Sequence, residues 1–228
     1  MLVYNKLDLC KNCIIHNLNN SALDNVEFLI WCNSQLVDVK NFIISLRHPK
    51  ISKIFISDKN IGVSAYNHLI EQSKSNYILE LDDDAIAPYE FDKVMVELYD
   101  TLPSDVGLLG LDMSWGKKTF ATRYSFTDYT HYKNAYGDKY RIYEQGKADL
   151  IPGTCRMSRR ELWTKCGGHP KVLYGSDLKV NKNALAHNFK TSILLTAKGK
   201  YVIHKPDPNT QVQNWKMRTC KIANKNAS

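Results

Sequence analysis

The segment Tyr77-Ile-Leu-Glu-Leu-Asp-Asp-Asp-Ala-Ile-Ala-Pro88 joins an apolar run of strand length to three consecutive carboxylates, Asp82, Asp83 and Asp84. Three adjacent negative charges repel one another unless a cation neutralises them. Side chains two residues apart on an extended backbone share a face, so we expect Asp82 and Asp84 to point at one site and Asp83 to point away. Two carboxylates at the end of a strand suit Mg²⁺ or Mn²⁺ that carries a phosphate ligand. A solvated acidic turn is the alternative.

The sequence on both sides of this segment alternates between apolar runs and stretches of helical periodicity. Further strands are predicted at 2–4, 26–32, 51–57, 106–111, 151–158, 191–195 and 200–204, and helices at 9–18, 36–46, 63–73, 91–99, 159–166 and 177–187. Repeated strand–helix–strand units predict an α/β fold with a mixed, mostly parallel sheet and helices on both faces. Ligands of such sheets bind beyond the carboxyl ends of the strands, which is where the three aspartates lie.

The length and composition are those of one globular domain. The chain has 228 residues, of which 43% are apolar and 24% are charged, enough to bury a full core. No apolar stretch approaches the roughly 18 residues of a membrane span, and residues 1–6 lack the pattern of a signal peptide. We therefore expect a soluble intracellular protein without a transmembrane segment. The net charge of +8 favours partners rich in phosphate, such as a nucleotide, a nucleic acid or an anionic membrane surface.

The cysteines do not form a disulfide or zinc pattern. Only one pair has the spacing of a CxxC motif, and no second pair completes a tetrahedral site. Ordinary thiols in a reducing compartment are the expected state, which favours a cytoplasmic protein, in the host cytoplasm if the protein is viral. The six residues are Cys10, Cys13, Cys32, Cys155, Cys166 and Cys220.

The segment 114–147 interrupts the alternation of strands and helices. It is about 34 residues long without a clear period, which is too long for a plain connection, so we expect a binding excursion. Tyrosine and basic residues are interleaved in it, a composition that suits either sugar rings or nucleic acid, where cations meet phosphates and rings meet bases. A small local core with solubilising lysines is the alternative. Its residues of these types include Lys117, Lys118, Arg123, Tyr124, Tyr129, Tyr132, Lys133, Tyr136, Lys139, Tyr140, Arg141 and Tyr143.

Several short motifs follow one another in a recognisable order. Asn60-Ile-Gly-Val-Ser-Ala-Tyr-Asn67 precedes the three aspartates, and Gly153, Gly167-Gly168, Asp177 and His204 come after them. This order resembles the nucleotide-diphospho-sugar transferases of the GT-A fold, a Rossmann-like α/β fold, and most closely the inverting glycosyltransferases of family 2. The resemblance extends from Tyr4-Asn5 to about His204.

The resemblance implies a metal site. Asp84 would ligate Mn²⁺ (or Mg²⁺), and Asp82 would contact the ribose or the metal shell. His204 would complete the site or contact the diphosphate, and a purely structural histidine at a strand end is the alternative. A carboxylate and imidazole set favours Mn²⁺. The cation would stabilise the diphosphate that leaves as the glycosidic bond breaks.

The resemblance also implies a nucleotide-sugar site, with a UDP-sugar as the expected donor. Gly62 would let the backbone approach the nucleotide, although Asn-Ile-Gly is also a good turn. Relatives carry an aspartate after the second strand to read the base, and this chain has Asn33 at that place. The other residues implied at the donor are Asn60, Ala65, Asn67, Asp82, Asp83 and Lys205.

Asp177, in Tyr174-Gly-Ser-Asp177, matches the general base of inverting enzymes, which takes the proton of the acceptor hydroxyl. Capping of the following helix by Ser176 or Asp177 is the structural alternative. The residues implied at the acceptor are Gly153, Gly168 and Tyr174.

Together these features predict a metal-dependent, inverting glycosyltransferase in one domain, 1–228. Residues 1–113 would form the nucleotide-sugar-binding half, 114–204 the acceptor-binding and catalytic half, and 205–228 a basic tail. The expected acceptor is a hydroxyl on a glycan, lipid or protein. Hydroxymethylated DNA, as used by viral DNA-modifying glycosyltransferases, is the alternative. A nucleotidyltransferase ranks lower because no Gly-rich basic loop follows the first strand, and a non-catalytic basic binding module would leave the aspartates unexplained.

Overall fold

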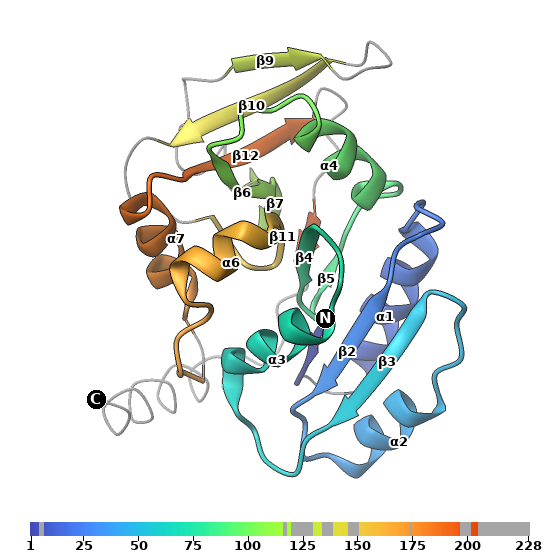
Figure 1. The fold of residues 1–228 in the computed structure, drawn as a ribbon. Helices are drawn as coiled ribbons and strands as arrows, with labels where there is room; N and C mark the ends of the chain where they lie inside the picture. The colour runs from blue at the N-terminus through green and yellow to red at the C-terminus, as the bar shows by residue number, and fades with distance from the viewer. Residues whose placement is uncertain are drawn as a thin grey trace.

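The computed structural model describes residues 1–4, 7–115, 118–119, 130–133, 139–145, 151–173, 175–196 and 202–204 (Figure 1). The strands are β1 (Leu2–Val3), β2 (Phe28–Cys32), β3 (Ile51–Ile56), β4 (Tyr77–Leu81), β5 (Ala85–Ile86), β6 (Val106–Leu111), β7 (Met113–Trp115), β8 (Lys118–Thr119), β9 (Thr130–Lys133), β10 (Lys139–Gln145), β11 (Cys155–Arg159), β12 (Lys190–Thr196) and β13 (Val202–His204). The helices are α1 (Leu7–Asn20), α2 (Val37–Ser45), α3 (Ala65–Gln72), α4 (Phe91–Tyr99), α6 (Arg160–Cys166) and α7 (Asp177–Ala186), with a 3₁₀ turn at Gly62–Ser64.

The strands form a parallel sheet at the N-terminal side and a mixed sheet beyond it. The first sheet has the order β1-β2-β3, and the second has the order β4-β11-β6-β12-β10-β9. A parallel bridge between Leu2 and Asp82 joins the two sheets at the point where β4 ends. In the second sheet β6 and β12 are parallel, whereas β11 runs antiparallel to both β4 and β6. The first of the three aspartates therefore lies where the two sheets meet.

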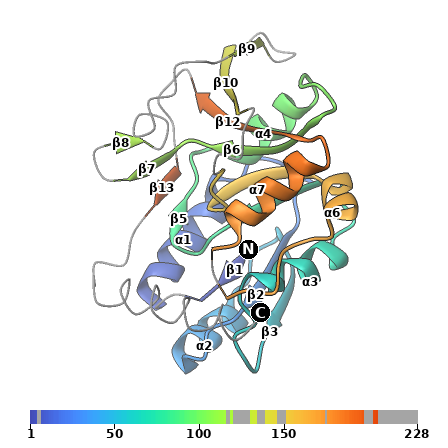
Figure 2. The ribbon, with the colours of Figure 1, turned by 90° about the vertical axis from the view of Figure 1, so that its left-hand side faces the viewer.

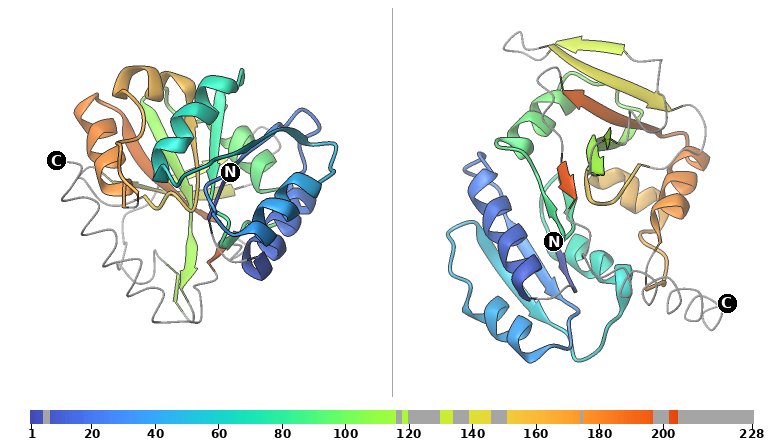
Figure 3. Two further views of the ribbon diagram at one scale, coloured as in Figure 1. Left: turned by 90° about the horizontal axis from the view of Figure 1, so that it is seen from below. Right: turned by 180° about the vertical axis from the view of Figure 1, so that it is seen from behind.

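Helices cover both faces of these sheets (Figure 3). One buried cluster contains apolar side chains of α1, α2 and α4, and a second contains those of α3, α6 and α7. On β4, Leu81 belongs to the first cluster and Ile78 to the second. Because side chains alternate along a strand, Glu80 and Asp82 point to the same face as Ile78, toward α3.

The predicted α/β fold is confirmed, and the predicted helices are all present with ends that differ by a few residues. Parallel pairing dominates the first sheet. The antiparallel pairs of the second sheet come from β11 and from strands in the segment 114–147, where an excursion was expected. In the small third sheet β13 also pairs antiparallel with β5. The described parts of that segment include β9 and β10, which pair antiparallel at the outer edge of the sheet next to β12. The rest of the segment lies outside the described residues, as do the basic tail 205–228 and Cys220.

A third, small sheet brings the end of the described chain back to the aspartates. Its order is β5-β13-β7-β8, and Figure 2 shows β13 between β5 and β7. His204 on β13 pairs with Ala85 on β5, the residue that follows Asp84.

The other described cysteines, Cys10, Cys13, Cys32, Cys155 and Cys166, are free and buried, as expected for ordinary thiols. None of the described helices is long and apolar enough to span a membrane.

Candidate active site

A cavity of about 200 Å³ opens at the carboxyl ends of β1, β2 and β4. Loops that follow parallel strands meet at this edge, which explains why residues distant in sequence converge there. Five carboxylates line the cavity, together with residues of the β3–α3 turn and of the loop before α7. The carboxylates are Glu80, Asp82, Asp83, Asp84 and Asp177.

Asp82 is the most strongly perturbed of these acids. Its Oδ1 atom accepts a hydrogen bond from the hydroxyl of Tyr66 on α3, at 3.2 Å. Burial, followed by the charges of Asp84 and Asp177, raises the pKa of Asp82 well above its usual range. A cation bound beside Asp82 would offset both the burial and the repulsion.

Asp83 is held by the main chain of the first sheet. Its Oδ2 atom accepts a hydrogen bond of 2.7 Å from the main-chain N–H of Tyr4, which follows β1. Burial and, to a smaller extent, the charge of Asp83 raise the pKa of Cys10 on α1 to about 12. Asp83 thus ties the end of β1 to the end of β4. It also lines the same cavity as Asp82 and Asp84, so the expectation that it points away from them stays a prediction.

The aspartates fit a divalent cation. Among the described residues, no group of three or more His, Cys, Asp or Glu side chains is arranged to hold a metal ion. Mg²⁺ in nucleotide enzymes is usually held by one or two carboxylates, with phosphate oxygens and water as its other ligands. Asp82 and Asp84 supply two such carboxylates, and a cation would relieve the repulsion that raises the pKa of Asp82. The register of β13 brings the main chain of His204 close to Asp84, but its side chain and Lys205 lie outside what the structure describes.

The turn after β3 needs its glycine. Gly62 has a φ of 62°, and a Cβ at this position would lie 2.3 Å from Cα of Leu173. The main-chain N–H of Gly62 donates to Oδ1 of Asn60 at 2.8 Å, and its carbonyl accepts from Nδ2 of Asn33 at 3.0 Å. The sequence indicated the turn, but it did not reveal that Asn33 ties it to the end of β2.

Asp177 is the first residue of α7, and its carboxylate lines the cavity. Ser176 makes no capping hydrogen bond with its side chain. Oδ1 of Asp177 instead lies 3.3 Å from Nη1 of Arg156. The capping alternative therefore has no support from Ser176, and the Asp177 side chain is held inside the cavity.

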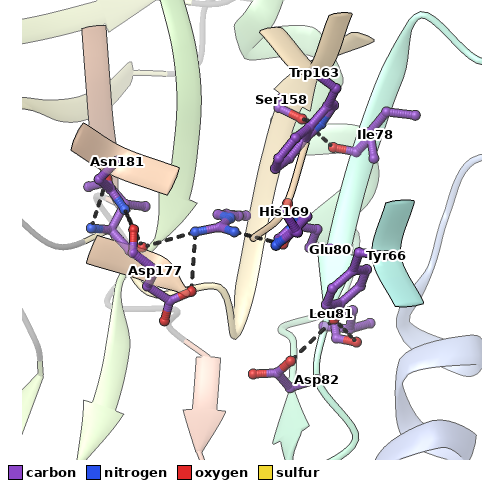
Figure 4. Close-up of polar contacts among 12 residues, drawn as sticks. Tyr66, Ile78, Glu80, Leu81, Asp82, Ser158, Trp163, His169, Asp177 and Asn181 are labelled. Atoms are coloured by element: carbon purple, nitrogen blue, oxygen red, sulfur yellow. Dashed lines mark hydrogen bonds and ion pairs between the residues drawn. The ribbon is translucent and has the colours of Figure 1, made fainter. Parts of the chain in front are cut away.

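A buried charge network lies beneath Asp177, and sequence reasoning missed it. Nη2 of Arg156 is 2.8 Å from Oε2 of Glu80, and Nε2 of His169 is 3.3 Å from the same oxygen. Burial would raise the pKa of Glu80, but Arg156 and His169 hold it down at about 2. Arg156 donates to both Glu80 and Asp177, and Figure 4 shows these two acids with His169 between them. A charged residue inside each of two otherwise buried strands was the signal in the sequence.

Comparison with protein families agrees with this geometry. The family described as Glycosyl transferase family 2 matches residues 1–166. The chain belongs to this family. The match includes the aspartate cluster and Arg156 and ends before Asp177. No curated protein matches the sequence.

Solved structures with a similar fold are also glycosyltransferases. The mannosyltransferase PcManGT from Pyrobaculum calidifontis, in complex with GDP-Man and Mn²⁺, is 13% identical with a TM-score of 0.68, over 97% of this chain and 60% of that one. TarS from S. aureus, in complex with UDP-GlcNAc, is 13% identical with a TM-score of 0.67, over 91% and 58%. GalNAc-T7 with UDP, GalNAc and Mn²⁺ is 11% identical with a TM-score of 0.64, over 91% and 43%.

At these identities the likeness shows the fold alone, which is GT-A. The family 2 chain spans between 43% and 60% of the length of these three structures.

Two predicted site residues of the family 2 chain have structural contacts instead of cavity contacts. Nδ2 of Asn67 donates to the carbonyl of His169 at 3.0 Å, and the N–H of His169 donates back to Oδ1 of Asn67 at 2.7 Å. A Cβ on Gly168 would lie 2.5 Å from the same Oδ1. Asn67 and Gly168 therefore shape the loop after α6, and neither lines the cavity. Their roles in donor and acceptor binding stay predictions, and Tyr174 lies outside the described residues.

Proposed function

We propose that this family 2 chain transfers a sugar from a nucleotide diphosphate to an acceptor hydroxyl, with inversion at the anomeric carbon. The observation that carries the proposal is the convergence on one cavity of Asp82, Asp84 and Asp177. Two carboxylates suited to a cation and a third suited to proton transfer are what a single displacement at a sugar needs.

The donor would occupy the side of the cavity next to the aspartates. Asp82 and Asp84 would hold Mn²⁺ (or Mg²⁺), which neutralises the charge of the departing diphosphate. Asn60 and Gly62 would contact the nucleotide from the β3–α3 turn. We expect the donor to be a UDP-sugar. The complexes of the structural neighbours with GDP-Man, UDP-GlcNAc and UDP support a nucleotide-sugar donor. Residues 1–113 would thus form the donor half.

Asp177 would serve as the general base. It lines the cavity together with Asp82 and Asp84, and its side chain is 35% exposed, so an acceptor can reach it. The carboxylate would take the proton of the acceptor hydroxyl as that oxygen attacks from the face opposite the diphosphate. Residues 114–204 would complete the acceptor half around it.

The acceptor is a glycan, lipid or protein hydroxyl in this proposal. A hydroxymethylated base of DNA is the second candidate, and the net charge of +8 is the observation that favours it. Once the screen described next has identified the donor, transfer assays with each class of acceptor distinguish the two candidates. Product on DNA alone would select the second candidate.

A screen of nucleotide sugars by thermal melting tests the proposal. In the presence of Mn²⁺, the correct donor at 100 times its Kd should stabilise the folded chain by about 2.7 kcal/mol. The same sugar without its nucleotide should give no shift. If no nucleotide sugar raised the melting temperature or was turned over with Mn²⁺ present, the proposed function would be wrong.

Gly153 offers a second test, because it lies against the proposed base. A Cβ at Gly153 would lie 2.7 Å from Oδ1 of Asp177, too close for an ordinary contact. We expect Gly153→Ala to displace this carboxylate and to lower kcat by about 10²-fold, the loss typical of a misplacement of about 1 Å. Donor affinity, measured by calorimetry, should stay near the wild-type value.

The matched control for this variant is Gly107→Ala. A Cβ at Gly107 would lie 2.6 Å from Leu162 Cδ1, and Gly107 does not line the cavity. This control should lower the melting temperature more than Gly153→Ala and leave kcat nearly unchanged at a temperature where it is folded. Equal kcat values for wild type and Gly153→Ala would contradict the assignment.

A further inference from the structure

We propose that Arg156 is a positioning residue that holds the carboxylate of Asp177 in the cavity, and that Glu80 fixes Arg156 for this task. The inference rests on the proposed function, because Asp177 acts there as the base. It adds to the site two buried residues, Glu80 on β4 and Arg156 on β11.

The register of the sheet puts Arg156 between the two acids. Arg156 is the second residue of β11 and lies directly opposite Glu80 on β4. Its side chain is fully buried, with 0% exposure, and Glu80 is buried as well, at 2%. One end of the guanidinium contacts Glu80, while Nη1 contacts Asp177 and the carbonyl of Ile151. The arginine thus has an anchored end in the core and a second end at the wall of the cavity.

Stability alone does not account for this pair. A buried ion pair repays its desolvation only when further hydrogen bonds satisfy its remaining atoms. Among the described residues, Glu80 Oε1 and Arg156 Nε have no hydrogen-bond partner. The neighbours of Arg156 on β11, Cys155 and Met157, are buried apolar residues of the first cluster, on the opposite face of the sheet. Because burying Arg156 here costs free energy, we expect the residue to serve a function at the cavity in addition to packing in the core.

Asp177 needs a fixed cation because it lies among like charges. Four other carboxylates line the same cavity, and their repulsion would turn the Asp177 side chain outward. Arg156 opposes this movement through Oδ1 of Asp177, which leaves Oδ2 for the proton of the acceptor. Gly153 supports the same geometry, since its missing Cβ makes room for Oδ1 of Asp177.

The test removes both charges of the buried pair at once. Glu80→Leu with Arg156→Met replaces the ion pair by apolar side chains of similar length, a change that folded proteins usually tolerate. We expect the double variant to melt close to the wild type and to keep its KM for the donor. Its kcat should fall by about 10- to 100-fold, because the base is no longer held in place.

Two controls separate positioning from a general effect on the fold. Glu161→Leu with Lys165→Met makes the same substitutions at an exposed pair on α6 and should leave kcat unchanged. In an Asp177→Asn background, the Glu80→Leu and Arg156→Met changes should cause no further loss of kcat, because they act through Asp177.

The outcomes distinguish this inference from the proposed function. A wild-type protein that turns over no nucleotide sugar would contradict the proposed function. If the wild type were active and the folded double variant had the same kcat, the inference would be wrong while the proposed function still held. An additive loss of kcat in the Asp177→Asn background would have the same meaning. If the double variant did not fold, Arg156→Lys keeps the charge beside Glu80 but lacks the fork that reaches both acids. It should lower kcat without changing KM for the donor, and an unchanged kcat would overturn the inference.

Discussion

Replacing Asp177 with asparagine is expected to lower kcat by about 10²-fold or more, the contribution typical of a general base. The amide has nearly the same shape as the carboxylate, so it can fill the same space at the start of α7, but it cannot accept the proton of the acceptor. The donor would lie next to Asp82 and Asp84, and its affinity should therefore stay close to the wild-type value. Steady-state kinetics give kcat, and calorimetry with the nucleotide sugar gives the affinity.

Ser176→Ala is the matched control for this prediction. Ser176 precedes Asp177 and also lines the cavity, yet its side chain makes no capping hydrogen bond. Ser176 is buried, but no capping hydrogen bond is lost with its hydroxyl, so kcat should stay within about 2-fold of the wild type. An Asp177→Asn variant that kept its turnover would exclude Asp177 as the base. The anomeric configuration of the product, read by proton NMR, checks the displacement itself, because retention would contradict it.

Much of the fold was predictable from local sequence. Leu36, Val39, Ile43 and Leu46 have helical spacing, and the helix they predict is α2. The direction of β11 could not be predicted, because periodicity indicates a strand without indicating which neighbours it pairs with. The strand β10 at 139–145 was also missed, since the alternation of polar and apolar residues in Lys139-Tyr140-Arg141-Ile142 breaks at Tyr143.

Some residues of the candidate site were likewise predictable from the sequence, and others were not. The spacing of Asp82 and Asp84 on an extended chain was enough to predict a shared site, and both do line one cavity. The resemblance supplied Asp177, which local patterns alone leave as a helix cap. Glu80 and Arg156 are 76 residues apart, and only the register between β4 and β11 reveals that they meet. Contacts set by register are therefore the part of this site that the sequence could not reveal.

Asp84→Asn is expected to remove the dependence of donor binding on Mn²⁺. With the wild type, a chelator should weaken binding of a nucleotide diphosphate by about 10- to 100-fold, the range seen when metal sites are disturbed. In the variant, affinity should be weak with or without Mn²⁺, because a single carboxylate, Asp82, would remain on the face that meets the diphosphate. Calorimetric titrations with Mn²⁺ and with chelator measure both affinities.

Without metal, Asp84→Asn should have the opposite effect on stability from its effect on donor binding. Asp84 is, after burial, the largest cause of the raised pKa of Asp82, so Asp84→Asn relieves a repulsion. The variant should melt at or above the wild-type temperature when chelator is present, although it binds the donor less well. Asp83→Asn is the matched control: it weakens the contact with the N–H of Tyr4, so it should lower stability while binding keeps its dependence on Mn²⁺. Equal donor affinity of the wild type with Mn²⁺ and with chelator would contradict the metal assignment, because the crowded carboxylates would then have no cation to hold.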